Sequence, residues 1–205
     1  ELADGGTAGE LAEADVNIEA LGGTIAINAP VLAVASGSDA GTSNVGAFVD
    51  IEGGLLGSVG GPVEISITDQ VEATTSGGGS LSEVVEIHAG GDVQTSGAGL
   101  VVANTLLLNP SYTSSLGGPF PGGVSNAVFD LATSVDRVGI GSNLASTTID
   151  NSLVTTAVTV GLGASYDATL PGLVFNGGAG TENVAFTAGG DLQLLTDGNP
   201  VNVNN

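Results

Sequence analysis

Apolar and polar residues alternate at a period of two in short runs from one end of the chain to the other. Residues 63–68 read Val-Glu-Ile-Ser-Ile-Thr, and residues 85–89 read Val-Glu-Ile-His-Ala. Because successive side chains of a β-strand point to opposite faces, such runs predict strands with one buried face. Clusters of Gly, Ser, Asn and Asp separate the runs and favour turns. Since spacing typical of a helix is nearly absent, the sequence predicts an all-β fold.

The strand pattern contains an internal repeat. Residues 85–94, Val-Glu-Ile-His-Ala-Gly-Gly-Asp-Val-Gln, recur as residues 184–193, Val-Ala-Phe-Thr-Ala-Gly-Gly-Asp-Leu-Gln, and looser copies lie at 16–30 and 63–76. A unit of strand, small-residue corner and strand is typical of a β-solenoid, in which successive coils hydrogen-bond to one another. Only 3% of the residues are aromatic, which also favours stacks of small side chains. We expect a parallel β-solenoid (β-helix) of roughly eight to ten coils with about 20–25 residues each, and an antiparallel β-sandwich is the alternative.

Composition divides the chain into four parts. Residues 1–15 contain five acidic residues and three glycines, and are expected to form an acidic N-terminal tail or cap. Residues 16–108 and 124–205 carry the strand pattern and are expected to form two parts of the solenoid. The segment 109–123 between them contains three prolines, which predicts a Pro/Gly-rich loop.

The charge balance excludes several classes of protein. The chain carries 22 acidic residues against one basic residue, Arg137, so its formal net charge is −21. A single cation cannot neutralise a phosphate backbone, which excludes nucleic acid as a partner, and an anionic membrane surface would repel the chain. No apolar run reaches the roughly 18 residues of a membrane span, so direct membrane insertion is not expected. Because 41% of the residues are hydrophobic, we expect a folded core beneath an acidic surface rather than disorder.

No catalytic residues are expected. A Ser-His-Asp triad would need His88, the only histidine, which the alternation places at an exposed, outward position of its strand. Carboxylate pairs hydrolyse glycosidic bonds in many enzymes, but with 22 acidic residues such pairs arise by chance. The candidate pairs are Asp130 with Asp136 and Asp150 with Asp167.

Calcium is the cofactor that the acidic corners favour, because hard cations take oxygen ligands. Residues 177–185 nearly fit the calcium-binding nonapeptide G-G-x-G-x-D-x-U-x, with Glu182 in place of Asp. Asp92 and Asp191 take equivalent positions in the repeat, where capping the turn through side-chain hydrogen bonds is the favoured role. The candidate calcium ligands are Asp50, Glu52, Asp92, Glu182 and Asp191.

The last five residues carry no charged side chain, in contrast to residues 1–15. They read Val-Asn-Val-Asn-Asn, an alternating strand. Unpaired strand edges template further pairing, and addition of a terminal strand to a neighbouring subunit builds fibres. Val201 and Val203 are therefore candidate assembly residues of a homopolymer.

Four segments share a degenerate pattern of alternating aliphatic residues and small corners: 15–34, 85–109, 129–151 and 184–198. They resemble the repeats of filamentous-haemagglutinin-like adhesins and related bacterial surface β-helices. The resemblance implies a secreted, surface-attached, non-enzymatic protein with a parallel β-helical stalk. Such proteins usually run to many hundreds of residues, so this chain is expected to be a segment of a longer parent chain or a polymerising subunit. The expected function is that of an extracellular structural protein, an adhesin stalk segment or filament subunit. A carbohydrate-binding or carbohydrate-cleaving β-helix, with glycans as partners, is the alternative.

Overall fold

The computed structural model describes residues 2–5, 11–37, 44–53, 60–77, 80–108, 128–140, 146–154, 158–162, 173–177, 182–185, 192–196 and 201–204. All regular secondary structure in these residues is β-strand, which confirms the all-β class. A helix able to cross a membrane is therefore not found among them.

Seventeen strands follow one another in the described residues, and most carry the alternating pattern. They are β1 (Leu2–Gly5), β2 (Leu11–Ala20), β3 (Gly22–Ile27), β4 (Val31–Gly37), β5 (Asn44–Gly53), β6 (Gly60–Ile67), β7 (Gln70–Gly77), β8 (Ser80–Ala89), β9 (Val93–Thr95), β10 (Leu100–Leu108), β11 (Val128–Ile140), β12 (Ser146–Asn151), β13 (Val158–Leu162), β14 (Leu173–Gly177), β15 (Glu182–Ala185), β16 (Leu192–Thr196) and β17 (Val201–Asn204).

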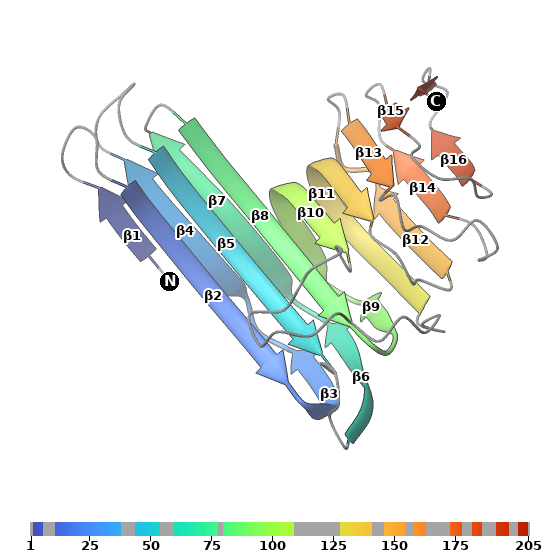
Figure 1. Ribbon diagram of the computed structural model, residues 1–205, viewed down its shortest axis with the longest axis horizontal. Helices are drawn as coiled ribbons and strands as arrows, with labels where there is room; N and C mark the ends of the chain where they lie inside the picture. The colour runs from blue at the N-terminus through green and yellow to red at the C-terminus, as the bar shows by residue number, and fades with distance from the viewer. Residues whose placement is uncertain are drawn as a thin grey trace.

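Every pairing between these strands is parallel. The antiparallel sandwich is therefore wrong for the part of the chain that the structure describes. Early in the chain each strand pairs with the strand three places later, as in β2 with β5, β3 with β6 and β4 with β7. Figure 1 shows the result, a stack of parallel strands with the two chain termini at opposite ends.

The pairings form three ladders, which we call faces A, B and C. Face A consists of β2, β5, β8, β10, β11, β13, β15 and β17 in that order. Face B consists of β3, β6, β9, β11, β12, β14 and β16. Face C consists of β1, β4, β7, β10 and β11. Two strands turn a corner. β10 pairs first with β7 on face C and then with β8 on face A. β11 pairs first with β9 and β12 on face B and ends with β13 on face A.

The core of face A is a row of aliphatic residues stacked on copies of themselves. Val16 pairs with Val49, which pairs with Val85. The row continues through Leu106, Val138 and Val160, and in the backbone register Val184 and Val203 hold the next two positions. Each member from Val49 to Val160 is at most 2% exposed. Burial of these stacked side chains, together with the backbone ladder, stabilises the stack.

The separation between paired residues changes along the chain, which differs from the uniform 20–25 residues expected. On face A the step is 36 residues from Asn44 to Ser80 and 19 residues from Glu182 to Val201. The early steps are long because the chain also crosses face C. Beyond β11 the described strands pair on faces A and B alone, so the path around the stack is shorter.

The ladders cross the boundaries expected from composition. β1 lies within residues 1–15 and pairs with β4, and β2 extends over the boundary at residue 15. The expected loop 109–123 lies outside the described residues. The strands before and after it pair with each other in register, from Val101 with Thr133 to Leu108 with Ile140. Faces A and C therefore continue between the two expected parts.

Candidate functional site

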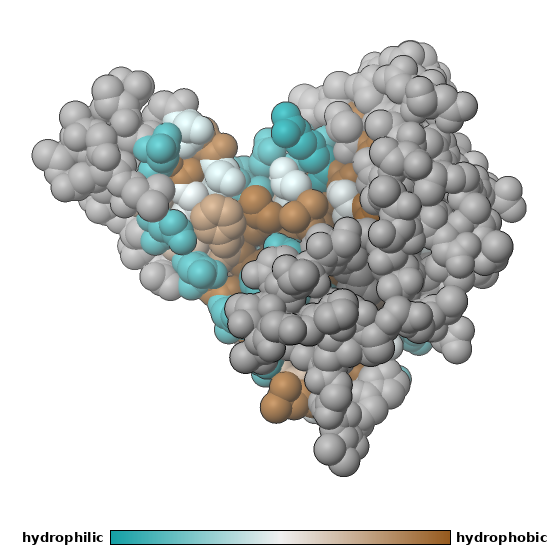
Figure 2. Space-filling view, in the orientation of Figure 1, coloured by the Kyte–Doolittle hydropathy of each residue, from teal (hydrophilic) through white to brown (hydrophobic). Residues whose placement is uncertain are grey.

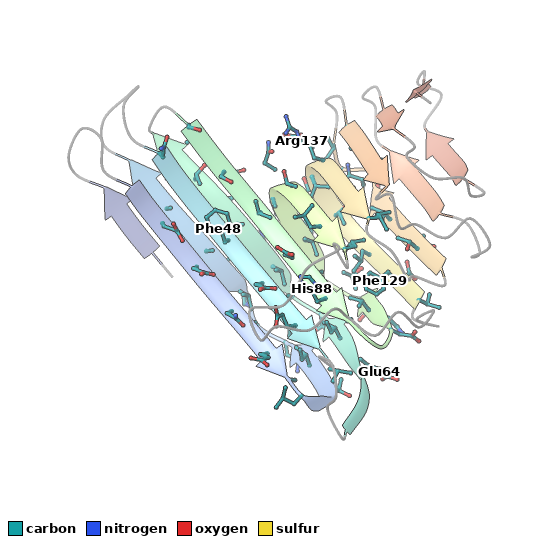
Figure 3. All side chains as sticks on the ribbon, in the orientation of Figure 1. Phe48, Glu64, His88, Phe129 and Arg137 are labelled. Carbon is teal, nitrogen blue, oxygen red and sulfur yellow. The ribbon has the colours of Figure 1, made fainter. Side chains whose placement is uncertain are left out.

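Polar side chains gather on the outward side of face A where β5 pairs with β8. In the register of these strands, Asp50 lies opposite Glu86, and Glu52 lies opposite His88. Alternate residues of a strand point to the same side of a sheet. Val49, Ile51, Val85 and Ile87 face the core, so these four polar residues share the outward side. We call them the acid–histidine cluster, and Figure 3 labels His88 on this surface.

His88 lies on the outward side as the alternation indicates, but the expectation that it is exposed is wrong. Only 1% of its side chain is exposed, compared with 23% for Glu86. Alternation tells which side of a strand a residue takes, but it does not tell what covers that side. The His88 Nε2 atom lies 2.7 Å from the Glu86 Oε1 atom, within hydrogen-bond distance. An ionised carboxylate only accepts hydrogen bonds, so this contact places a proton on Nε2.

The cluster brings three potential metal ligands together. One ligand atom each from Asp50, Glu52 and His88 lies within 4.8 Å of the other two. The Oδ1 atom of Asp50 is buried and has no hydrogen-bond donor among the described residues. Burial, then the neighbouring charge of Glu52, raise the pKa of Asp50 from 3.8 to about 7, and a charged His88 opposes this shift. The site therefore disfavours the negative charge of the Asp50 carboxylate.

An apolar strip borders the cluster on the outward side of face A. Phe48 on β5 lies opposite Val84 on β8, and Leu107 on β10 lies opposite Glu86. All three apolar side chains are partly buried. Figure 2 shows brown apolar residues in the middle of this face with teal hydrophilic residues around them. Low polarity beside the carboxylates is one source of the desolvation that raises the pKa of Asp50.

Basic residues do not compensate the cluster. Arg137 is the only Lys or Arg in the sequence. It is exposed on β11, which β10 separates from β8 on face A. Apart from a proton on His88, the described residues thus offer no positive charge to the three carboxylates.

Two of the five candidate calcium ligands, Asp50 and Glu52, meet in this cluster. Asp92 is not in that group, and its Oδ1 atom accepts a 2.8 Å hydrogen bond from the N–H of Val128, at the start of β11. Glu182 begins β15 and pairs with Val158 and Val201, while the placement of its side chain is not described. Asp191 lies outside the described residues.

The sequence pattern did not indicate His88 and Glu86 as members of the site. Residues 49–53 read Val-Asp-Ile-Glu-Gly and residues 85–89 read Val-Glu-Ile-His-Ala. Aligning these two segments, 36 residues apart, places Glu52 beside His88 as the structure does. The clearest internal repeat instead aligns 85–94 with 184–193, and this alignment sets Thr187 at the position of His88.

Of the two carboxylate pairs considered for glycoside hydrolysis, Asp130 and Asp136 lie on different faces of the stack, and the pair of Asp150 with Asp167 lies partly outside the described residues. Asp130 lies on face B, opposite Thr148. Asp136 precedes the part of β11 on face A, and its Oδ2 atom accepts a 3.2 Å hydrogen bond from Asn104 Nδ2. Asp150 lies on β12, and Asp167 is outside the described residues.

No protein-family model matches the chain, and neither a curated protein nor a solved structure is significantly similar to it. The proposals below therefore depend on the residues and the geometry alone.

Proposed function

We propose that the chain is a parallel β-solenoid with a structural, non-enzymatic role at the extracellular surface, as a stalk segment or a self-assembling filament subunit. The observation that carries this proposal is the ladder of face A. Its eight described strands run parallel from β2 to β17, and one aliphatic row passes through all of them. Such an arrangement suits a rod, because each added strand extends the same core along one axis.

The two ends of the ladder support assembly. Among the described strands, β2 pairs on face A with β5 alone, and β17 pairs with β15 alone. Val16 and Ile18 on β2 are only partly buried, whereas Val49 and Ile51, their partners on β5, are 1% and 0% exposed. The end of the core at β2 is thus incompletely covered.

A second copy of the chain fits this end. Val203 holds the last register position of the aliphatic row that Val16 begins. A copy that places its β17 edge against β2 would continue both the ladder and the row. Because the two edges are different surfaces at opposite ends of the stack, the contact is head-to-tail and yields an open filament.

The outward side chains oppose sideways association. Glu13, Asp15 and Glu19 are exposed on β2. Like charges on neighbouring rods repel, and acidic residues along strands discourage lateral pairing. Growth is thereby limited to the ends of the rod.

Electron microscopy and sedimentation of the purified chain over a concentration series test this function. Val203→Asp places a charge in the aliphatic row, and Asn202→Asp adds the same charge at the preceding residue of β17. We expect filaments that Val203→Asp suppresses and Asn202→Asp retains. Isolated rods at every concentration would exclude the filament subunit and leave the stalk segment. Binding or cleavage of a polysaccharide by such rods would overturn the structural role in favour of the carbohydrate alternative.

A further inference from the structure

We infer that the acid–histidine cluster binds a divalent first-row transition metal ion of the zinc type, with Asp50, Glu52 and His88 as ligands. The inference does not depend on the proposed function, because it concerns one pair of strands in the middle of the described stack. It also differs from the calcium expected from the acidic corners, since one ligand is an imidazole.

The distances suit a single ion after a small movement of side chains. Zinc binds histidine nitrogen and carboxylate oxygen at about 2.0–2.2 Å, so tetrahedral ligand atoms lie about 3.4 Å apart. Each of the three residues offers one ligand atom, which for His88 is Nδ1 or Nε2, and these atoms lie within 4.8 Å of one another. The set therefore has to close by at most about 1.4 Å to reach zinc distances. Asp50 and Glu52 are only partly buried, which leaves their side chains room to rotate.

The electrostatics also point to a cation. Asp50, Glu52 and Glu86 place three carboxylates beside a buried imidazole, without a Lys or Arg among them. A buried oxygen without a donor, such as Asp50 Oδ1, requires an explanation, and a bound ion supplies one. A divalent ion at this position would offset the mutual repulsion of the neighbouring carboxylates.

Glu86 acts in this site as a positioning residue. Histidines that bind metals usually donate the other ring N–H to a carboxylate, which fixes the tautomer and the orientation of the ring. The 2.7 Å contact between His88 Nε2 and Glu86 Oε1 has this form. With the proton on Nε2, the lone pair of a neutral ring is on Nδ1, which is the nitrogen we assign to the metal.

The donor set favours zinc over calcium. Calcium takes six to eight oxygen ligands, whereas imidazole suits zinc, copper, iron and nickel. The ligands come from β5 and β8, which pair 36 residues apart in the chain. A bound ion would therefore link two neighbouring strands of face A from the outside.

The histidine ring itself reports on binding, and this test needs no substitution. The chain has one histidine and no cysteine, so its imidazole nitrogen resonances are unique and any nitrogen-ligated site must include His88. We expect Zn²⁺ added to chelator-treated full-length chain to shift the Nδ1 resonance and to saturate at one equivalent. Ca²⁺ at the same concentration should leave the resonance in place. An unchanged resonance with millimolar Zn²⁺, or an equal shift with Ca²⁺, would overturn the inference.

Calorimetric titration of variants with Zn²⁺ identifies the ligands. Asp50→Asn, Glu52→Gln and His88→Gln should each weaken the affinity by more than about 100-fold, and Glu86→Gln by about 10–100-fold. The matched control is Glu64→Gln, at an exposed position of β6 labelled in Figure 3, which should leave the affinity unchanged. If Glu64→Gln weakened binding as much as the cluster variants, the ion would be held diffusely by the acidic surface and the site would be refuted. Should a cluster variant fail to fold, as circular dichroism would show, the resonance test on the unsubstituted chain still decides.

Discussion

The side chain of Asn151 pairs with both backbone groups of Val135. Its Nδ2 atom donates to the Val135 carbonyl oxygen at 3.0 Å, and its Oδ1 atom accepts from the Val135 N–H at 2.9 Å. The primary amide thus takes the place of a peptide group in a neighbouring strand. It does so at the end of face C, where no later described strand pairs with residues 133–135 of β11. Asn151 therefore supplies hydrogen-bond partners for Val135 at the point where the described strands stop pairing on face C.

Asn151→Ala should destabilise the protein by about 2–5 kcal/mol, because two buried backbone groups lose their partner. Asn151 is 0% exposed, so water does not replace the lost hydrogen bonds without a rearrangement. Urea denaturation followed by circular dichroism measures the loss. The control is Asn104→Ala, which removes an exposed side chain bonded to Asp136 and should cost less than about 0.5 kcal/mol. Equal costs for the two variants would contradict the role assigned to Asn151.

Two glycines of the turn after β9 should respond differently to alanine. A Cβ at Gly99 would collide with the backbone oxygen of Ile67, so Gly99→Ala must push the turn away from the end of β6. Gly97 has a φ of +64° and open space around the added Cβ, so Gly97→Ala meets backbone strain alone. We expect about 1 kcal/mol for Gly97→Ala and a larger loss for Gly99→Ala. Thermal denaturation of the two variants ranks them, and the reverse order would refute the close approach.

Stability without metal should fall as the pH rises from about 4 to about 7. The raised pKa of Asp50, about 7, means that this carboxyl is protonated in the folded chain but ionised in the unfolded chain across this range. Folding therefore takes up a proton in this range. The stabilisation that results is lost as the pH rises through the pKa of Asp50 in the folded chain. Glu52, Glu86 and His88 face the same group and contribute to the field around it.

Denaturation midpoints at several pH values, with a chelator present, measure this slope. Asp50→Asn should flatten the profile and make the protein more stable than the unsubstituted chain at pH 8. Asp130→Asn removes an exposed acid on face B and should retain the slope. A profile that Asp50→Asn leaves unaltered would show that other groups set the pH dependence.

Phe129 should be the most costly apolar side chain to truncate on face B. It is 0% exposed and lies between Val93 and Thr147 in the ladder, to the right of His88 in Figure 3. Phe129→Ala should destabilise the protein by about 3–5 kcal/mol, since it opens a large cavity. Val128→Ala, one residue earlier and 41% exposed, is the matched control and should cost less than about 1 kcal/mol. Comparable unfolding midpoints for both would contradict the packing of this face.

The side of each strand could be predicted from the sequence because alternation is a local property. Val85 and Ile87 are buried as the pattern indicates, and the parallel stack agrees with the internal repeat. The separation between paired residues could not be predicted in this way. It depends on the length of each corner and on whether the chain crosses face C, and residues distant in sequence decide both. One such long-range contact is the pairing of the Asn151 side chain with the backbone of Val135, where a neighbouring strand would otherwise pair.

The candidate site was predicted only in part for the same reason. Asp50 and Glu52 are acidic residues that alternate with apolar ones, so the sequence alone indicates them as candidate ligands. Their meeting with His88 depends on the register of β5 and β8. The burial of His88 depends on which residues cover the outward side of face A. The alternation within β8 carries no information about those residues.

The direction of the backbone ladders has a mechanical consequence. Hydrogen bonds between parallel neighbours lie along the axis of the stack, and the termini are at opposite ends. A pulling force applied through the termini would therefore open the bonds one coil after another, as a zipper opens, instead of shearing many together. Each coil of 19–36 residues would release about 65–120 Å of extended chain. A parallel stack loaded in this way would lengthen in steps and dissipate force, so the rod that we propose would also act as an extensible tether.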